Sequence, residues 1–214
     1  MKILVACEYS GVVRDAFRKL GHDAWSCDII PTDADPTYHI QGDVIEILDH
    51  GWDMMIAHPP CTYLTLAGNK WYKPEYKDRF PDRLKQMKDA ADFFIKLANA
   101  PIKRIAIENP IGRMSSIFRK PDQIIQPYHF GHPVRKSTCL WLEGLPALKS
   151  TNIVPFEIDI FPSGNTQSKW HTETGHIKDR AERSKARSKT FQGIADAMAQ
   201  QWGGLVEKVN SISA

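Results

Sequence analysis

The chain has 214 residues, of which 42% are hydrophobic and 25% are charged, and its net charge is +3. These values are typical of a globular domain and exclude a disordered chain or a coiled coil. The length suits one domain with a sizeable core, so a single domain over residues 1–214 is expected. No stretch approaches the roughly 20 apolar residues of a bilayer span, so no membrane partner is expected.

The spacing of cysteine and histidine bears on metals and on the cell compartment. The four cysteines are widely and unevenly spaced, at Cys7, Cys27, Cys61 and Cys139. This spacing is typical neither of a disulfide scaffold nor of a zinc site with C-x-x-C pairs, and it indicates reduced thiols in a cytoplasm. The eight histidines show no metal-ligand spacing, so no metal site is expected.

The N-terminal half alternates strand and helix signals. Expected strands cover residues 3–6, 23–27, 52–57 and 104–107, and expected helices cover residues 12–20 and 84–98. A further short element opens at residues 42–44. Strands alternating with helices predict an α/β fold, in which a mostly parallel sheet carries helices on both faces. In such a sheet the chemistry is expected at the carboxyl ends of the strands.

The C-terminal half is less regular. A strand is expected over residues 137–142 and a helix over residues 193–202. Between them, the region 143–186 is rich in Pro, Ser, Gly and Lys and has little periodicity. This region is therefore expected to be irregular.

Polar or reactive residues stand where the expected strands stop. Cys7 and Glu8 follow the first strand, Asp28 follows the second, Cys61 follows residues 52–57, and Glu108 follows residues 104–107. Because the carboxyl ends of parallel strands share one edge of the sheet, these side chains are expected to converge. Their convergence is a stronger signal than any one of them.

Asp28 is a candidate for binding a ribose. It follows Gly11 by 17 residues, close to the spacing at which an acidic residue binds ribose hydroxyls in nucleotide-binding α/β folds. The alternative is a solvated loop carboxylate. The loop of Gly11 lacks the G-x-G-x-x-G pattern that a pyrophosphate requires, which favours S-adenosylmethionine as the cofactor.

Cys61 and Glu108 are candidates for chemistry on a substrate. Pro59 and Pro60 stiffen the turn before Cys61, and a rigidly held thiol is a candidate nucleophile. A buried structural cysteine is the alternative. Glu108 is expected to have a raised pKa and to donate a hydrogen bond as a neutral carboxyl, unless it only caps local amides.

These motifs, in this order, resemble the motif series of the DNA cytosine-5 methyltransferases. The matching elements are Cys7 to Phe17, Asp28, Gly42-Asp43-Val44, Pro59-Pro60-Cys61 and Glu108-Asn109-Pro110. The stretch 187–203 is similar to the terminal segment of small phage and prophage members, so the resemblance covers residues from about 3 to 203. It implies the Rossmann-like fold of class I S-adenosylmethionine-dependent methyltransferases. It also implies a protein of a bacterial host cytoplasm, with a phage as one source.

The resemblance implies a covalent mechanism on double-stranded DNA. Cys61 would add to C6 of a cytosine flipped out of the duplex, and Glu108 would bind N3 and the exocyclic amine. The activated C5 would then take the methyl group of S-adenosylmethionine. Either Arg135 or Lys136 would supply a cation beside the cytosine, because the family's Gln-x-Arg-x-Arg motif matches this segment poorly.

The resemblance also implies which residues bind the cofactor. The first loop would contribute Cys7, Glu8, Tyr9, Ser10 and Gly11. The later motifs would contribute Asp28 for the ribose, Asp43 for the adenine end, Pro60 beside the thiol, and Thr190 where the pocket closes.

DNA contacts are expected from two segments. The region 143–186 replaces a full target recognition domain, and its basic end includes Lys169 and Arg183, followed by Arg187. Residues Lys70, Trp71 and Tyr72 follow the Cys61 loop and interleave charge with aromatic rings. The alternatives are a solvated loop and aromatic lids over the core. The sequence leaves the oligomeric state open, and a dimer could supply further DNA contacts.

Two other functions stay open at this stage. The same fold could act on a free cytosine nucleotide or transfer a group other than methyl. A catalytically idle protein that binds DNA or cofactor is the alternative from another class, although binding alone requires neither Cys61 nor Glu108.

Overall fold

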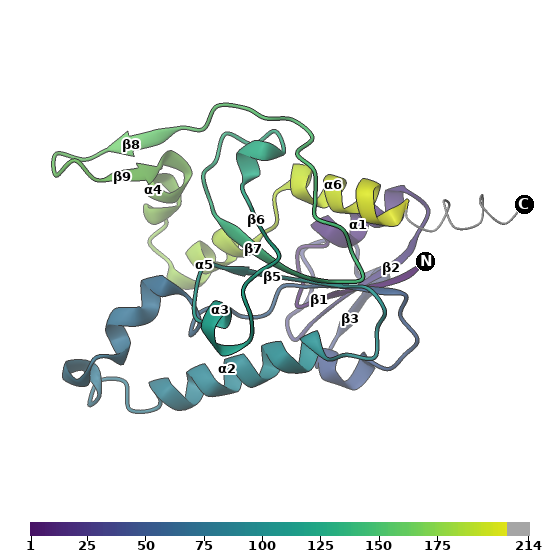
Figure 1. Cartoon of the computed structure of the whole chain (residues 1–214), viewed down its shortest axis with the longest axis horizontal. Coiled ribbons are helices and arrows are strands. Elements are labelled where there is room, and N and C mark those ends of the chain that lie inside the picture. Colours follow the sequence, from purple (N-terminus) through teal and green to yellow (C-terminus); the bar gives the residue numbers. More distant parts are fainter. Residues whose placement is uncertain (205–214) are drawn as a thin grey trace, which may run out of the picture.

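The computed structural model describes residues 1–204, and a seven-stranded sheet lies at its centre, with the strand order β3-β2-β1-β4-β5-β7-β6 (Figure 1). The strands of this sheet are β1(Lys2–Ala6), β2(Asp23–Asp28), β3(His39–Gln41), β4(Met54–Ala57), β5(Ile105–Pro110), β6(Gln123–Ile125) and β7(Thr138–Glu143). The α-helices are α1(Val12–Lys19), α2(Arg83–Ala98), α3(Met114–Ile117), α4(Lys169–Gly175), α5(Arg180–Ser188) and α6(Gln192–Gly203). A separate hairpin pairs β8(Ile158–Ile160) with β9(Thr166–Ser168).

Short 3₁₀ helices complete the connections. They are η1(Pro36–Tyr38), η2(Val44–Ile47), η3(Leu66–Tyr72), η4(Pro74–Tyr76) and η5(Pro127–His129). Over residues 1–204, no helix has both the length and the apolar character needed to cross a membrane.

The directions of the strands confirm the expected fold class. Strands β3, β2, β1, β4 and β5 pair in parallel, and β7 lies between β5 and β6, antiparallel to both. The order reverses between β1 and β4, which makes this point the crevice of the sheet. With helices on both faces, this is the Rossmann-like fold of methyltransferases that the resemblance implied.

Alternation along the strands builds two apolar layers. In β1, Ile3 and Val5 belong to one core cluster, whereas Leu4 and Ala6 belong to the other, and all four are fully buried. Successive side chains of a strand point to opposite faces, so a strand covered on both sides is apolar throughout. The continuous run of residues 3–6 therefore reflects burial on both faces.

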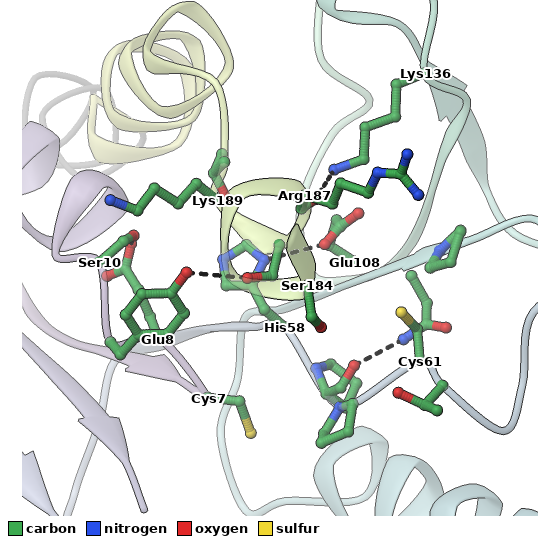
Figure 2. A pocket seen from close by; sticks show the side chains of 18 residues that line it. Cys7, Glu8, Ser10, His58, Cys61, Glu108, Lys136, Ser184, Arg187 and Lys189 are labelled. Carbon is green, nitrogen blue, oxygen red and sulfur yellow. Dashed lines mark hydrogen bonds and ion pairs between the residues drawn. The ribbon is translucent and has the colours of Figure 1, made fainter. Parts of the chain in front are cut away.

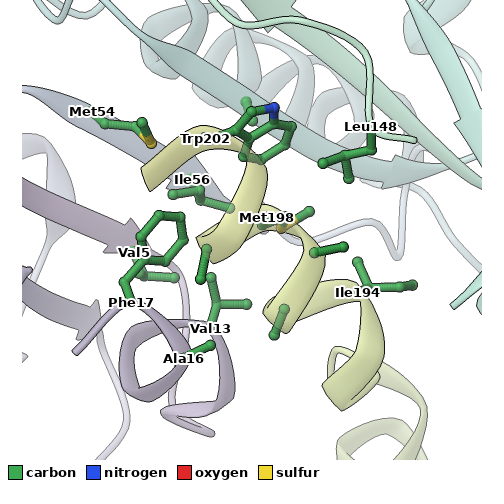
Figure 3. Packing of buried hydrophobic residues seen from close by; sticks show 14 of the residues in the cluster. Val5, Val13, Ala16, Phe17, Met54, Ile56, Leu148, Ile194, Met198 and Trp202 are labelled. Atoms are coloured by element: carbon green, nitrogen blue, oxygen red, sulfur yellow. The ribbon is translucent and has the colours of Figure 1, made fainter. Parts of the chain in front are cut away.

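Helix α6 covers one face together with α1. Trp202, Met198 and Ile194 pack in the cluster that holds Val13 and Phe17 (Figure 3). The indole of Trp202 is fully buried and donates a hydrogen bond to the carbonyl oxygen of Pro146 at 2.9 Å. The opposite face is covered by α2, whose Phe94 meets Trp141 edge-to-face.

The structure corrects two expectations about local structure. The region 143–186, expected to be irregular, contains the β8–β9 hairpin, α4 and most of α5. None of the α5 side chains is buried, so the sequence of this helix lacks the apolar periodicity from which a helix is predicted. The Asp179 side chain caps the helix by accepting a hydrogen bond from the Glu182 amide. Strand β5 also continues through Glu108, which lies within the sheet and pairs with Leu140.

Trp202→Ala is expected to lower the free energy of unfolding by about 3–5 kcal/mol, because a large buried ring leaves a cavity and the Pro146 carbonyl loses its donor. Urea unfolding followed by circular dichroism measures the effect. Leu84→Ala is the matched control, because Leu84 is 64% exposed, and its cost should be small. Equal losses in the two variants would contradict the central place of α6 in the core.

Candidate active site

Two adjoining cavities lie at the carboxyl ends of β1 and β4, where the strand order reverses. The smaller, about 220 Å³, is lined by Cys61, Glu108 and Lys136 among others (Figure 2). The larger, about 710 Å³, is lined by Asp28 and Asp43 together with apolar side chains. The two cavities share a wall, formed by Cys7, Tyr9, His58, Pro60 and Ser188.

The loop after β1 turns sharply into α1. Cys7 has a positive φ of 58° and Gly11 has a φ of 71°, a conformation that favours glycine. A Cβ at Gly11 would also lie 2.8 Å from the Cβ of Ala34, so glycine is required there for two reasons. This turn places Cys7, Tyr9 and Ser10 against the smaller cavity.

The Glu8 carboxylate caps α1, because Gly11 at the N-cap has no side chain to do so. It accepts hydrogen bonds from the amides of Val13 at 2.7 Å and Arg14 at 3.2 Å, and from the hydroxyl of Ser10. Burial raises the pKa of Glu8, and nearby His58 and these hydrogen bonds oppose the rise. Both carboxylate oxygens therefore bind the protein itself, which gives Glu8 a structural role that the motif match did not predict.

Contacts from the end of β5 hold the Cys61 loop. The side-chain amide of Asn109 donates to the carbonyl oxygen of Pro59 at 3.0 Å, and the Leu64 amide donates to the Cys61 carbonyl at 2.9 Å. A Cβ at Gly112 would lie 2.1 Å from the Leu64 carbonyl oxygen, so only glycine allows this approach. Sequence reasoning missed Gly112, since an isolated glycine after a strand has no distinctive signal.

The expectation of a raised pKa for Glu108 is wrong. Burial alone would raise it, but a 3.2 Å hydrogen bond with His58 and the charges of His58 and Lys136 outweigh burial, so the pKa lies below its ordinary value. Glu108 is therefore a carboxylate in the free protein. The His58 side chain is 8% exposed, and it lies on the edge of both cavities.

The Cys61 thiol faces this carboxylate. Burial raises the pKa of Cys61, the negative charge of Glu108 raises it further, and Lys136 opposes both. In the free protein at neutral pH, the thiol is consequently protonated while the neighbouring Glu108 carboxyl is not.

The structure separates the two candidate cations. The ammonium of Lys136 lines the smaller cavity, donates to the carbonyl oxygen of Arg187 at 2.8 Å, and lies over the ring of Trp170. Arg135 instead hydrogen-bonds Thr166 of β9 and lies over the ring of Phe156. Lys136 is therefore the cation that lies beside Cys61 and Glu108.

The end of α5 and the residues after it cover the smaller cavity. Arg187, Ser188, Lys189 and Thr190 all line it. The Tyr9 hydroxyl joins this segment to the first loop, donating to the Lys185 carbonyl oxygen at 2.7 Å and lying 3.0 Å from the Ser188 hydroxyl. Residues from the two ends of the chain thus enclose one site.

The larger cavity has the features of a site for a nucleoside. The Asp28 carboxylate at the end of β2 has a pKa raised by burial, and Asp43 caps η2 by accepting from the Ile45 amide. Apolar walls come from side chains such as Ile29, Val44 and Phe93. Two carboxylates beside apolar walls fit a ribose joined to an adenine. Among residues 1–204, no group of three or more His, Cys, Asp or Glu side chains is arranged to hold a metal ion.

The expected DNA-binding residues lie outside the two cavities, apart from Arg187. On η3, the Tyr72 hydroxyl donates to the Tyr63 carbonyl oxygen, Trp71 packs edge-to-face on Tyr76, and Lys70 lies over the Trp71 ring. On the other segment, Lys169 pairs with Glu157, and Arg183 donates to the Ile177 carbonyl oxygen. Their role toward DNA stays a prediction.

No protein-family model matches the chain, and no curated protein does so. Among solved structures, a prophage-encoded E. coli protein that carries the provisional name DNA modification methyltransferase is similar, with 14% sequence identity and a TM-score of 0.47. The match covers 72% of this chain and 51% of that one. The chain therefore aligns with about half the length of this solved structure.

The rate at which iodoacetamide alkylates Cys61 should continue to rise above pH 9.0, the ordinary pKa of a thiol, because the pKa of Cys61 is raised. Glu108→Gln removes a negative charge and should move the rise to lower pH, whereas Lys136→Met should move it to higher pH. Mass spectrometry of the Cys61 peptide measures the rate. Glu143→Gln, on the exposed end of β7, is the matched control. An unmoved profile in Glu108→Gln would disprove the coupling.

Proposed function

We propose that the protein transfers a methyl group from S-adenosylmethionine to C5 of cytosine in double-stranded DNA. The observation that carries this proposal is the pairing of two cavities across one wall. The smaller presents a thiol, a carboxylate and an ammonium, from Cys61, Glu108 and Lys136. The larger presents the two aspartates at the ends of β2 and β3.

The larger cavity is assigned to the cofactor. Asp28 accepts hydrogen bonds from the ribose hydroxyls, as acidic residues at this position of the sheet do. Asp43 lies at the adenine end, and Ile29, Val44 and Phe93 cover the ring. When bound, S-adenosylmethionine supplies an electrophilic methyl group on a sulfonium centre.

The smaller cavity is assigned to a single cytosine flipped out of the duplex, since the C6 face is hidden within stacked DNA. The sulfur of Cys61 forms a bond to C6. The C5=C6 electron pair shifts to C4–C5, and the C4=N3 pair moves onto N3, which takes a proton. C5 becomes nucleophilic in this way and attacks the methyl group, whose bond to the sulfonium sulfur breaks. Loss of the C5 proton to water then re-forms C5=C6 while the bond between C6 and the Cys61 sulfur breaks, and the N3 proton returns to that sulfur by way of Glu108.

The free protein already holds the proton that this step requires. In the Cys61 and Glu108 pair the proton resides on sulfur, because the pKa of the thiol is raised and that of the carboxyl is lowered. As sulfur bonds to C6, this proton passes by way of Glu108 to N3. The adduct then contains a carboxylate again, and Lys136 stabilises the negative charge throughout.

Two projecting segments are assigned to the DNA backbone. The η3 segment, with Lys70, follows the Cys61 loop, and the β8–β9 hairpin precedes α4 and α5 (Figure 1). Lys70 on the η3 segment can neutralise a phosphate, and so can Lys169 and Arg183 on the helices α4 and α5 that follow the hairpin. Trp71 and Tyr72 brace the η3 segment. The contacts to the bases of the target sequence are assigned to the region 143–186.

Wild-type protein incubated with labelled S-adenosylmethionine and duplex DNA should produce 5-methylcytosine, identified by mass analysis of the nucleosides. Cys61→Ser should abolish turnover, and Glu108→Gln should lose at least about 2 kcal/mol of transition-state stabilisation. Duplex DNA with 5-fluorocytosine should trap a stable adduct on Cys61, because fluorine blocks the final loss of the C5 proton. Arg135→Met is the matched control for Lys136→Met, and only the second should slow the reaction.

Four results would reject this function. One is full activity of Cys61→Ser, and another is an adduct on a different residue. The third is methylation of a free cytosine nucleotide but not of DNA, which would establish the nucleotide-modifying alternative. N4-methylcytosine as product would likewise reject attack by C5.

Asp28→Asn is expected to weaken the binding of S-adenosylmethionine by about tenfold, because the ribose hydroxyls lose a charged acceptor. Isothermal titration calorimetry with the cofactor alone measures this, so the result does not depend on catalysis. Asp49→Asn is the matched control, since that side chain is 80% exposed. Unchanged affinity in Asp28→Asn would contradict the assignment of Asp28 to the ribose hydroxyls.

A further inference from the structure

His58 occupies the position where the two cavities meet. It follows β4 directly, its amide donates to the Ala6 carbonyl oxygen at 2.9 Å, and its ring belongs to the wall that both cavities share. Figure 2 shows the ring between the labelled side chains of Glu8 and Glu108. The motif match assigned no role to this residue.

The imidazole makes one hydrogen bond that only one tautomeric arrangement allows. Its Nδ1 lies 3.2 Å from Oε2 of Glu108, and a carboxylate can only accept, so Nδ1 carries the hydrogen. The other nitrogen, Nε2, is buried and has no hydrogen-bond partner among the described residues. The His58 side chain is 8% exposed, and its one side-chain hydrogen bond among the described residues is the one to Glu108.

We propose that His58 is a positioning residue for cytosine activation, which acts by holding Oε2 of Glu108 and leaving Oε1 directed to the base. This inference rests on the proposed function for the identity of the base. The hydrogen bond fixes the plane of the carboxyl, so that one oxygen faces N3 and the exocyclic amine. It also stabilises the carboxylate that remains once the proton has passed to N3.

The charge around His58 explains why an imidazole suits this position. Two carboxyl groups, those of Glu8 and Glu108, lie on opposite sides of its ring in Figure 2, and both line the smaller cavity. An aliphatic side chain there would leave these carboxylates facing each other in a poorly solvated space. An imidazole separates them and satisfies Glu108 directly.

Several other titratable or charged groups face the pair of His58 and Glu108 and contribute to any pH dependence. They are Cys61 after β4, Lys136 just before β7, Cys139 within β7, Arg187 in the last turn of α5, and Lys189 just after α5. The ionisation that His58 controls is that of Glu108. Loss of His58 should raise the pKa of Glu108, so activity should be lost at a higher pH as the solution is acidified.

His58→Leu and His58→Asn separate the hydrogen bond from the imidazole itself. Leucine removes the donor, whereas the asparagine Nδ2 can occupy the place of Nδ1 and still donate to Glu108. At saturating cofactor, the rate of adduct formation on 5-fluorocytosine DNA should fall about 10- to 100-fold in His58→Leu, the loss expected for a hydrogen bond to a charged group. His58→Asn should recover the rate to within about threefold of wild type.

A second readout does not depend on catalysis. In protein with ¹³C-labelled glutamate carboxyls, the Glu108 signal is assigned by its absence in Glu108→Gln, and its titration midpoint is followed by NMR. His58→Leu should raise this midpoint by about one pH unit or more, and His58→Asn by less. His50→Leu, at an exposed histidine beyond the site, should leave both the midpoint and the adduct rate unchanged.

The possible results distinguish failure of the role assigned to His58 from failure of the proposed function. An unmoved Glu108 midpoint in His58→Leu, or an adduct rate equal to that of wild type, would overturn it. If wild type forms no adduct, the cytosine proposal fails, and the NMR titration alone still decides whether His58 controls Glu108. If His58→Leu does not fold, His58→Ala replaces it as the variant without a donor, and an unmoved Glu108 midpoint or a wild-type adduct rate in His58→Ala overturns the inference.

Discussion

The pairing register of three parallel strands is the constraint on which the site depends. Ala6 of β1 pairs with Ala57 of β4, and Ala57 pairs with Ile107 of β5. The next residue along each strand is therefore Cys7, His58 or Glu108, and the three lie at one level of the sheet. Because side chains alternate between faces, a slip of one residue would turn each of them to the other side.

The same register explains why a buried carboxylate is tolerated at Glu108. Desolvation disfavours its charge, but His58 on the neighbouring strand end and Lys136 before β7 offset that cost. Removing either partner would leave this charge with only part of its compensation, which is expected to destabilise the protein. The backbone pairing that packs the sheet therefore also places the charged groups that stabilise the Glu108 carboxylate.

Enclosure of the site depends on parts of the chain that are distant in sequence. The end of α5 lies over the smaller cavity, and the Tyr9 hydroxyl joins it to the first loop. Ion pairs from Lys185 and Lys189 to Asp33 add a second connection. A cavity covered in this way is partly shielded from water, and a lower local dielectric strengthens the effect of Glu108 and Lys136 on any charge that develops within it.

The sequence by itself determined the main strands, the two long helices and the convergence of Cys61, Glu108 and Asp28, because apolar periodicity and the residues that end a strand are local signals. Only the tertiary structure decided the state and partners of these groups. The ionised state of Glu108, the choice of Lys136 over Arg135, the helix-capping role of Glu8 and the hydrogen bond of His58 all depend on residues brought together from different strands. The same holds for α5, whose side chains bury no apolar face and leave no period to detect. The periodicity of one segment can be read from that segment alone. A pKa shift, the close approach at Gly112 and the shared cavity wall each depend on contacts between segments that are distant in sequence.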